Sequence, residues 1–222
     1  MLGFYFIINM GVIMKKVLYI INLIVFIVTL SISFVILFRP FYYYQIKYLD
    51  LEKDTGYTYN EIKEAYDDVL DYCVLNKEFK TGKLKYSEEG KSHFKDVKIL
   101  FIICFILLII SLIIIIIKLI KYNKVKIKGF NPSFYSSISI ILICILLLAI
   151  ALIIGFDKCF DIFHMIFFYG KDNWLFDSYK DEIINILPKA YFMNCAILAI
   201  SLINSISLII IIKEIINKIK NK

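Results

Sequence analysis

Only two histidines occur in this chain of 222 residues, and each has an aspartate three positions away. His93 precedes Asp96, and His164 follows Asp161. Residues three apart share one face of a helix, so we expect each aspartate to orient its imidazole and raise the basicity of the ring. Two such rings predict general acid–base catalysis by His93 and His164. The alternative to catalysis is that both are ordinary surface histidines, each ion-paired with its aspartate.

Other reactive side chains lack a spacing that indicates a site. Two histidines and two aspartates could bind zinc, but neither an HExxH nor a CxxC spacing occurs in the sequence. The serines near the histidines are not in a nucleophile-elbow context; they are Ser87, Ser92 and Ser178. We therefore predict a site with no metal and no cofactor.

Composition places these histidines in a membrane protein. Apolar residues make up 60% of the chain and the mean hydropathy is +0.77, whereas soluble domains average about 45–50% apolar residues. This excludes an ordinary soluble enzyme and a disordered chain. Four segments are long and apolar enough to cross a bilayer: residues 17–38, 97–117, 134–155 and 191–212. None has an ionisable side chain in its middle, which argues against a pump or a channel.

Lysines are concentrated on one side of the predicted spans. Residues 1–16, 118–133 and 213–222 hold eleven lysines and one acid, whereas residues 39–98 and 157–189 hold fifteen cations and eighteen acids. This asymmetry predicts cytoplasmic termini and two extracellular segments, 39–96 and 156–190, and it indicates no nucleic-acid partner. We interpret the first span as an uncleaved anchor, and a secretory signal is the alternative; whether translation starts at Met1 or at Met14 stays open.

The first extracellular segment predicts two helices. Thr58 and Glu61 form a capping box before an amphipathic stretch whose apolar face is Ile62, Ala65, Tyr66, Val69 and Cys73. Ser87 and the two glutamates after it indicate a second helix start, with the helix continuing into the 97–117 span. The fold class is thus an all-α integral membrane protein: four transmembrane helices and a mostly helical extracellular cap.

Aromatic residues gather at the outer membrane surface, where twelve of the sixteen tyrosines lie. An interfacial aromatic belt is one interpretation, and an aromatic substrate pocket is the other. Gly90 is unfavourable in a helix by about 1 kcal/mol, which indicates either a close approach of another group or a loose helix start. The expected pocket residues are Gly90, Phe94, Tyr66, Phe163, Phe167 and Trp174. Whether Cys73 and Cys159, both in the outer segments, form a disulfide stays open.

Two stretches resemble a known family. Residues 87–98, SEEGKSHFKDVK, are similar to the S-x-x-G-x-x-H-F-x-D-V-K signature of the lipoprotein intramolecular transacylases of Gram-positive bacteria. A second conserved stretch of that family is matched by Phe163-His164, Phe167-Phe168, Trp174, Asp181, Ile184, Leu187-Pro188 and Phe192. Ser178 departs from the proline expected in many members.

The resemblance implies four membrane helices, an extracellular cap and catalytic histidines at His93 and His164. It also implies an activity: the sn-2 acyl chain of a diacylglyceryl lipoprotein moves to the α-amino group of its N-terminal cysteine. The partners would be that lipoprotein and the lipids of a Gram-positive cell membrane. A non-enzymatic tetraspan scaffold and a lipid hydrolase are the alternative functions.

Overall fold

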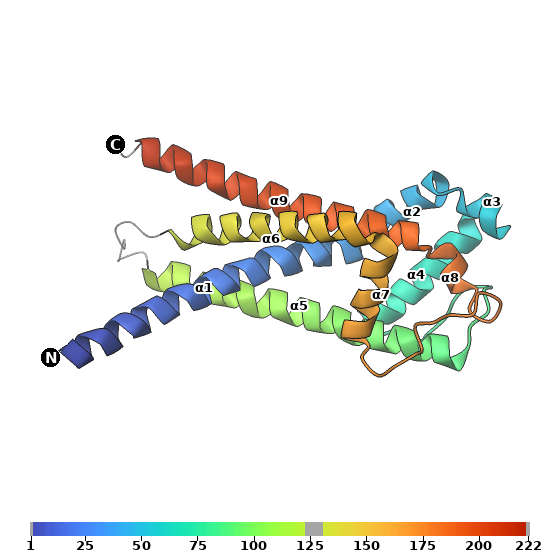
Figure 1. Cartoon of the computed structure of the whole chain (residues 1–222). Coiled ribbons are helices and arrows are strands. Elements are labelled where there is room, and N and C mark those ends of the chain that lie inside the picture. The colour runs from blue at the N-terminus through green and yellow to red at the C-terminus, as the bar shows by residue number, and fades with distance from the viewer. Residues whose placement is uncertain (1, 123–130, 221–222) are drawn as a thin grey trace. The chain divides into compact units, whose positions relative to one another are not determined.

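The structure is a computed structural model that describes residues 2–122 and 131–220, with side chains described for residues 13–121 and 131–220. Over these residues it is helical and contains no strand. The four long apolar helices are α1 (Leu2–Leu37), α5 (Glu88–Tyr122), α6 (Pro132–Ile154) and α9 (Lys189–Lys220) (Figure 1). Each is long and apolar enough to cross a membrane, so the predicted all-α, multi-pass architecture is confirmed.

Three of these helices extend well beyond the predicted spans, and the first of them, α1, begins at Leu2 rather than near residue 17. The apolar part of α5 begins near residue 99, but the helix itself begins at Glu88. Likewise, α9 continues through a lysine-rich end to Lys220. Hydropathy detects only the apolar part of a helix, whereas backbone hydrogen bonding continues into polar sequence. Half of the predicted 118–133 connection, residues 123–130, lies outside the described residues.

The segment after the first span folds into three helices: α2 (Arg39–Tyr48), α3 (Leu51–Thr55) and α4 (Tyr59–Leu75). The predicted capping box is present, because Glu61 N–H donates to Thr58 Oγ1 and Thr58 N–H donates to Glu61 Oε2 over 2.9 Å. The predicted apolar face of α4 is buried, with Ile62 and Ala65 fully inaccessible. This face packs into the core that supports the site.

Three tyrosines form the centre of that core. The rings of Tyr42 on α2 and Tyr66 on α4 stack with centroids 3.7 Å apart, and Tyr191 on α9 packs edge-on against Tyr42 at 5.1 Å. The Tyr42 hydroxyl donates to the carbonyl of Ile186, at the end of the short helix α8 (Ile183–Ile186), over 2.7 Å. The core therefore joins four helices.

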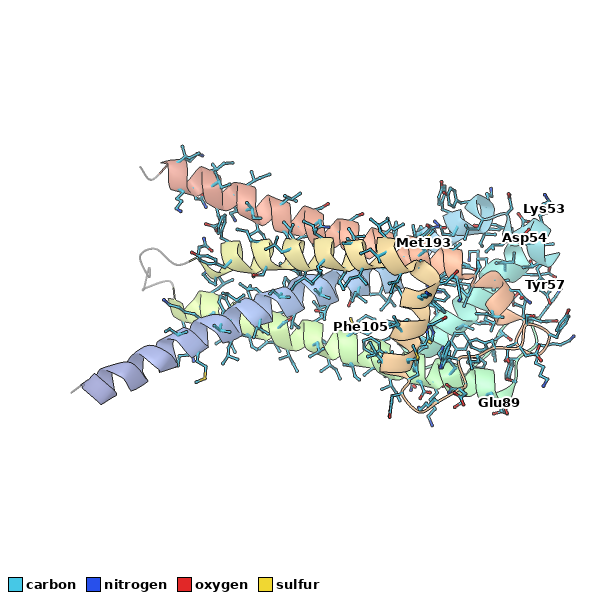
Figure 2. All side chains as sticks on the ribbon, viewed as in Figure 1. Lys53, Asp54, Tyr57, Glu89, Phe105 and Met193 are labelled. Atoms are coloured by element: carbon cyan, nitrogen blue, oxygen red, sulfur yellow. The ribbon has the colours of Figure 1, made fainter. Side chains whose placement is uncertain are left out.

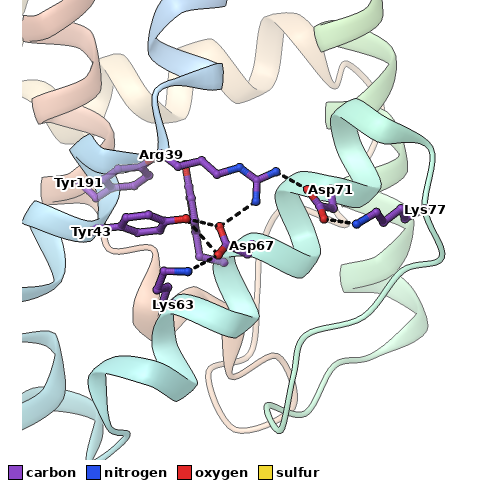
Figure 3. A network of polar contacts seen from close by, with 8 residues as sticks. Arg39, Tyr43, Lys63, Asp67, Asp71, Lys77 and Tyr191 are labelled. Carbon is purple, nitrogen blue, oxygen red and sulfur yellow. Dashed lines mark hydrogen bonds and ion pairs between the residues drawn. The ribbon is translucent and has the colours of Figure 1, made fainter.

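An ion-pair network ties α2 to α4 (Figure 3). The guanidinium of Arg39 donates to Asp67 Oδ1 over 2.9 Å and also to Asp71, one turn further along α4. Lys63 and the Tyr43 hydroxyl both donate to Asp67 over 2.8 Å. Arg39 thus bridges two carboxylates on one face of α4, which a planar fork of donors does better than a single ammonium.

The contacts divide the chain into two compact units. The first comprises the described residues of 1–32, 105–148 and 199–222; within it Ile27, Ile140 and Ile203 pack together, and Asn22 donates to the Ser111 carbonyl over 3.2 Å. The second, which we call the cap unit, comprises residues 33–104 and 149–198 and contains both histidines.

Candidate active site

The start of α5 positions His93. Ser87 caps the helix: its hydroxyl accepts a hydrogen bond from Gly90 N–H over 2.9 Å, which confirms the predicted helix start. The first turns carry charged residues such as Glu89 (Figure 2), so His93 lies in the polar part of α5, before its apolar stretch. The imidazole itself points inward and is only 5% exposed.

A separate amphipathic helix, α7 (Phe156–Phe167), positions His164. It begins after Gly155, whose φ of +82° breaks the path of α6 in a conformation that favours glycine. The Nδ1 atom of His164 lies 2.8 Å from the carbonyl oxygen of Phe160, one turn back. A carbonyl only accepts, so Nδ1 carries the hydrogen and Nε2 keeps a free lone pair. This ring is prepared to accept a proton.

The two histidines meet although 71 positions separate them. Their rings are 5.8 Å apart between centroids and tilted by only 24°. Phe168 packs against both rings, with centroid distances of 4.7 Å to His93 and 5.4 Å to His164. Two imidazoles that face each other can serve one reacting group from two sides.

The connection between α7 and α8, residues 168–182, covers both rings, and we call it the strap. Phe176 packs edge-on against His93 at 5.2 Å, and Trp174 lies against His164 at 4.9 Å. Together with Phe168 they leave the rings only 5% and 8% exposed. The strap therefore keeps bulk water away from the pair.

Burial keeps both rings neutral. Loss of solvation, helped by the neighbouring His164, lowers the pKa of His93 to about 4, although Asp96 and Asn173 act in the opposite direction. Burial also lowers the pKa of His164, against the hydrogen bond to Phe160 and the charge of Asp161. Near neutral pH each ring thus offers one N–H donor and one lone pair.

The two aspartates do not bond their histidines. Asp96 accepts hydrogen bonds from Lys171 Nζ over 2.5 Å and from Asn173 Nδ2 over 3.0 Å, both in the strap. Asp161 pairs with Lys189 at the start of α9, 3.4 Å away. Spacing on a helix puts Asp and His on one face, but each imidazole turns into the aromatic cluster while the carboxylates turn to lysines. The backbone carbonyl of Phe160 orients the His164 ring, a role that we expected Asp161 to have. A pattern of side-chain types does not reveal a backbone acceptor.

Two polar atoms at the site, His93 Nδ1 and Asn173 Oδ1, are buried without a partner. His93 Nδ1 makes no hydrogen bond within the described chain. An unpaired buried nitrogen is unfavourable by about 1–3 kcal/mol, so proteins rarely keep one without a use. Here it lies in the ring that faces the free lone pair of His164. This is the arrangement of a site that waits for a hydrogen-bonding ligand.

Comparison with known proteins identifies the family. Residues 17–192 match the model of the lipoprotein intramolecular transacylase Lit. The chain belongs to the Lit family. The membrane-integral lipoprotein intramolecular transacylase Lit from Bacillus cereus has a similar solved structure, with a TM-score of 0.81 and 25% identity over 93% of this chain and 96% of that one. No curated protein sequence matches.

Two further structures of the Bacillus cereus protein carry a replaced histidine. One has arginine there, with a TM-score of 0.81 and coverage of 99% of this chain and 98% of that one. The other has alanine, with a TM-score of 0.76 and coverage of 99% and 100%. Both are 25% identical to this chain. As a member of the Lit family, this chain is a membrane-embedded acyltransferase.

The pocket residues expected from sequence take different places in this Lit-family chain. Trp174 covers His164, and Phe94 packs beside His93 at 5.9 Å. Phe163 lies against His164, but it and Phe167 are about half exposed. Tyr66 instead belongs to the tyrosine core described above.

The surroundings of Gly90 decide between the two explanations given for it, a close approach of another group and a loose helix start. A Cβ atom there would lie 2.2 Å from Asp181 Oδ1 and 3.2 Å from Phe176, so the glycine allows a close approach by another group. Asp181 is 4% exposed and accepts hydrogen bonds from the Ser87 N–H over 2.7 Å and the Ser87 hydroxyl over 2.9 Å. It fastens the end of the strap to the start of α5. Sequence reasoning offered Asp181 only as a family match, without this role.

The cysteines of the cap unit are not bonded to each other. Cys73 and Cys159 are both free thiols, and Cys73 lies in the core at 3% exposure. Burial raises the pKa of Cys73 to about 12, so the thiol is protonated and behaves as a small apolar side chain. The open question of a disulfide is thereby answered for this structure.

Proposed function

We propose that this chain transfers the sn-2 acyl chain of a diacylglyceryl lipoprotein to the α-amino group of the same molecule's N-terminal cysteine, through His93 and His164. The product is a lyso-form lipoprotein with an N-acyl group. The observation that carries the proposal is the pair of facing, neutral, buried imidazoles, one with a free Nε2 lone pair and the other with an unpartnered Nδ1.

The reaction needs a proton to move between two substrate atoms. The neutral amino nitrogen attacks the ester carbonyl, a C–N bond forms, and the C–O bond to glycerol breaks. The nitrogen loses a proton and the glyceryl oxygen gains one, so the histidines end as they began. His164 Nε2 is suited to take the proton, and the N–H of His93 is suited to hydrogen-bond the departing oxygen; proton transfer of this kind contributes about 10²–10⁴ in rate.

The strap and its aromatic rings contribute in two further ways. They hold ester and amine of one molecule together, which removes the entropy loss of a bimolecular step. They also exclude water, which would otherwise hydrolyse the ester. Trp174 and Phe176 would contact the substrate first, since they cover the histidines.

We also propose that the cap unit faces outward in the cell membrane of a Gram-positive bacterium, with both termini in the cytoplasm. The lysine asymmetry supports this orientation. Helix α7 fits an interfacial position, because His164 lies on its buried face while Met165 and Ile166 are exposed. The lipid-anchored substrate would then present its ester at the level of the histidines.

The test uses a synthetic diacylglyceryl lipopeptide incubated with membranes that contain the protein. Acyl migration within one molecule leaves the intact mass unchanged, so fragment ions from tandem mass spectrometry must locate the chain. We expect N-acyl fragments with wild type and with the control Glu89→Gln, an exposed residue of the same helix. His93→Gln and His164→Gln should each reduce them at least about 100-fold.

The alternatives give different outcomes. Near-normal transfer in both histidine variants would refute the catalytic assignment. Loss of the acyl chain as free fatty acid would indicate a hydrolase. Unchanged diacylglyceryl fragments with wild-type protein would favour the non-enzymatic scaffold.

A further inference from the structure

The carboxylate of Asp96 is a built site for an ammonium group. Its side chain is only 13% exposed, and in this structure the Lys171 ammonium occupies it at 2.5 Å. Asn173 adds a neutral N–H donor to the same carboxylate over 3.0 Å. Burial acts to raise the pKa of Asp96, but the bonds from Lys171 and Asn173 lower it overall, so the group remains an anion.

Two further polar atoms near this carboxylate are buried without a hydrogen-bond partner. The Oδ1 atom of Asn173 is buried without a hydrogen bond, although the Nδ2 of the same amide is bonded to Asp96. His93 Nδ1 is the other orphan, on the same face of α5 one turn before Asp96. A side-chain hydrogen-bonding contact with Asn173 acts to raise the pKa of His93, so the two groups are neighbours. An ammonium group carries three donors; the Asp96 carboxylate and Asn173 Oδ1 accept hydrogen bonds, and His93 Nδ1 also accepts one in the tautomer that carries its hydrogen on Nε2.

We propose that Asp96 binds the α-ammonium group of the substrate's N-terminal cysteine, and that Lys171 of the strap occupies this position when no substrate is bound. The inference rests on the proposed function and names how its amine is recognised. Lys171 is well suited to leave, because its side chain is 49% exposed and flexible. One ammonium replaces another, so the carboxylate is never left unpaired.

The second aspartate beside a histidine does not offer such a site. Asp161 is 46% exposed, and Lys189 is shared between it and Asp157 at 3.4 and 3.7 Å. Water screens an exposed pair of this kind, so little binding energy is available there. The amine is therefore recognised on the His93 side.

The contact contributes to binding rather than to the chemical step. The bound ammonium must first release one proton to solvent, which gives the neutral amine that attacks, and a carboxylate favours the protonated form. Losing the carboxylate should therefore raise KM and leave kcat undiminished. A purely structural ion pair between α5 and the strap would instead lower kcat when either partner is replaced.

The experiment measures inhibition by two ether analogues of the diacylglyceryl lipopeptide, which cannot transfer a chain. One has a free N-terminus and the other is N-acetylated. With wild type we expect the free amine to bind on the order of tenfold more tightly. This preference should fall to about one in Asp96→Asn and increase in Lys171→Met, where the competing ammonium is gone. Glu88→Gln and Lys91→Met, which break an exposed ion pair on α5, are matched controls that should keep the wild-type ratio.

The outcomes separate this inference from the proposed function. A preference that survives Asp96→Asn overturns the inference, as does equal weakening of binding and activity in Asp96→Asn and Lys171→Met. Lys171→Met keeps the carboxylate and its Asn173 bond, so it remains informative if Asp96→Asn fails to accumulate. Wild-type protein that produces no N-acyl lipopeptide refutes the function, whatever the analogues do.

Discussion

Replacing Gly90 by alanine should destabilise the protein, although alanine is the better helix former. The new Cβ would lie 2.2 Å from Asp181 Oδ1 and 2.9 Å from its Cγ, so the carboxylate must move. Moving it breaks the hydrogen bonds from the backbone N–H and the hydroxyl of Ser87. The strap then loses its attachment to α5.

The magnitude follows from these contacts. Hydrogen bonds to a charged acceptor contribute about 1.5–3 kcal/mol each, so two of them contribute about 3 kcal/mol or more. Alanine gains at most about 1 kcal/mol of helix propensity over glycine. Gly90→Ala should therefore lower the free energy of unfolding by about 2 kcal/mol or more. Activity should fall too, because Phe176 adjoins both Gly90 and His93.

A second background tests the cause. In Asp181→Ala the obstructing carboxylate is absent, so adding Gly90→Ala should be neutral or stabilising by up to about 1 kcal/mol. Denaturant unfolding of the four proteins in detergent micelles measures the cycle, with Glu89→Gln as the surface control. The reasoning fails if Gly90→Ala stabilises the wild type, or if it destabilises both backgrounds equally.

Three other predictions concern His93, the core residue Tyr66 and the Arg39 ion-pair network. Because burial lowers the pKa of His93 from 6.5 to about 4, the unfolded chain takes up its proton first as the pH falls. The free energy of unfolding should therefore drop by about 3 kcal/mol as the pH falls between those two values. In a His93→Gln protein the melting temperature should depend less on pH. Tyr66→Phe should lower stability by less than about 1 kcal/mol, since it removes only a 3.4 Å contact with the Tyr191 hydroxyl, whereas Tyr66→Ala should lower it by about 3–5 kcal/mol; equal effects in chemical unfolding would contradict a packing role. Arg39→Met should lower stability by about 2 kcal/mol by leaving Asp67 and Asp71 facing each other, and Lys77→Ala, at an exposed end of the same network, by less than about 1 kcal/mol, as thermal melts at low and high salt would show.

Features encoded locally were predictable from the sequence. Hydropathy gave the four membrane helices, and the capping box of Thr58 and Glu61 gave the start of α4. The start of α5 at Ser87 is equally local, because the capping hydroxyl lies beside the amides that it satisfies. In each case a short window of sequence contains both partners.

Features that depend on long-range packing could not be predicted from the sequence. The shared histidine–aspartate spacing and the family resemblance both paired His93 with His164, but neither predicts how the two rings contact each other. Helical spacing placed Tyr66 on a buried face, but a buried stripe does not distinguish a core from a pocket. Likewise, the spacing of His93 and Asp96 fixes a shared face and leaves the side-chain rotamers free, and these turn Asp96 to Lys171.

The Arg39 bridge has a practical consequence. Arg39 is the only arginine in the chain, and the other permanently charged basic side chains are lysines. A dicarbonyl reagent selective for guanidinium groups would therefore label one position, with no engineered tag and no background from other sites. In the folded protein that guanidinium is 28% exposed and held between two carboxylates, so it should react faster when α2 and α4 part. The rate at which Arg39 is labelled would therefore measure the opening of the cap unit, also in native membranes.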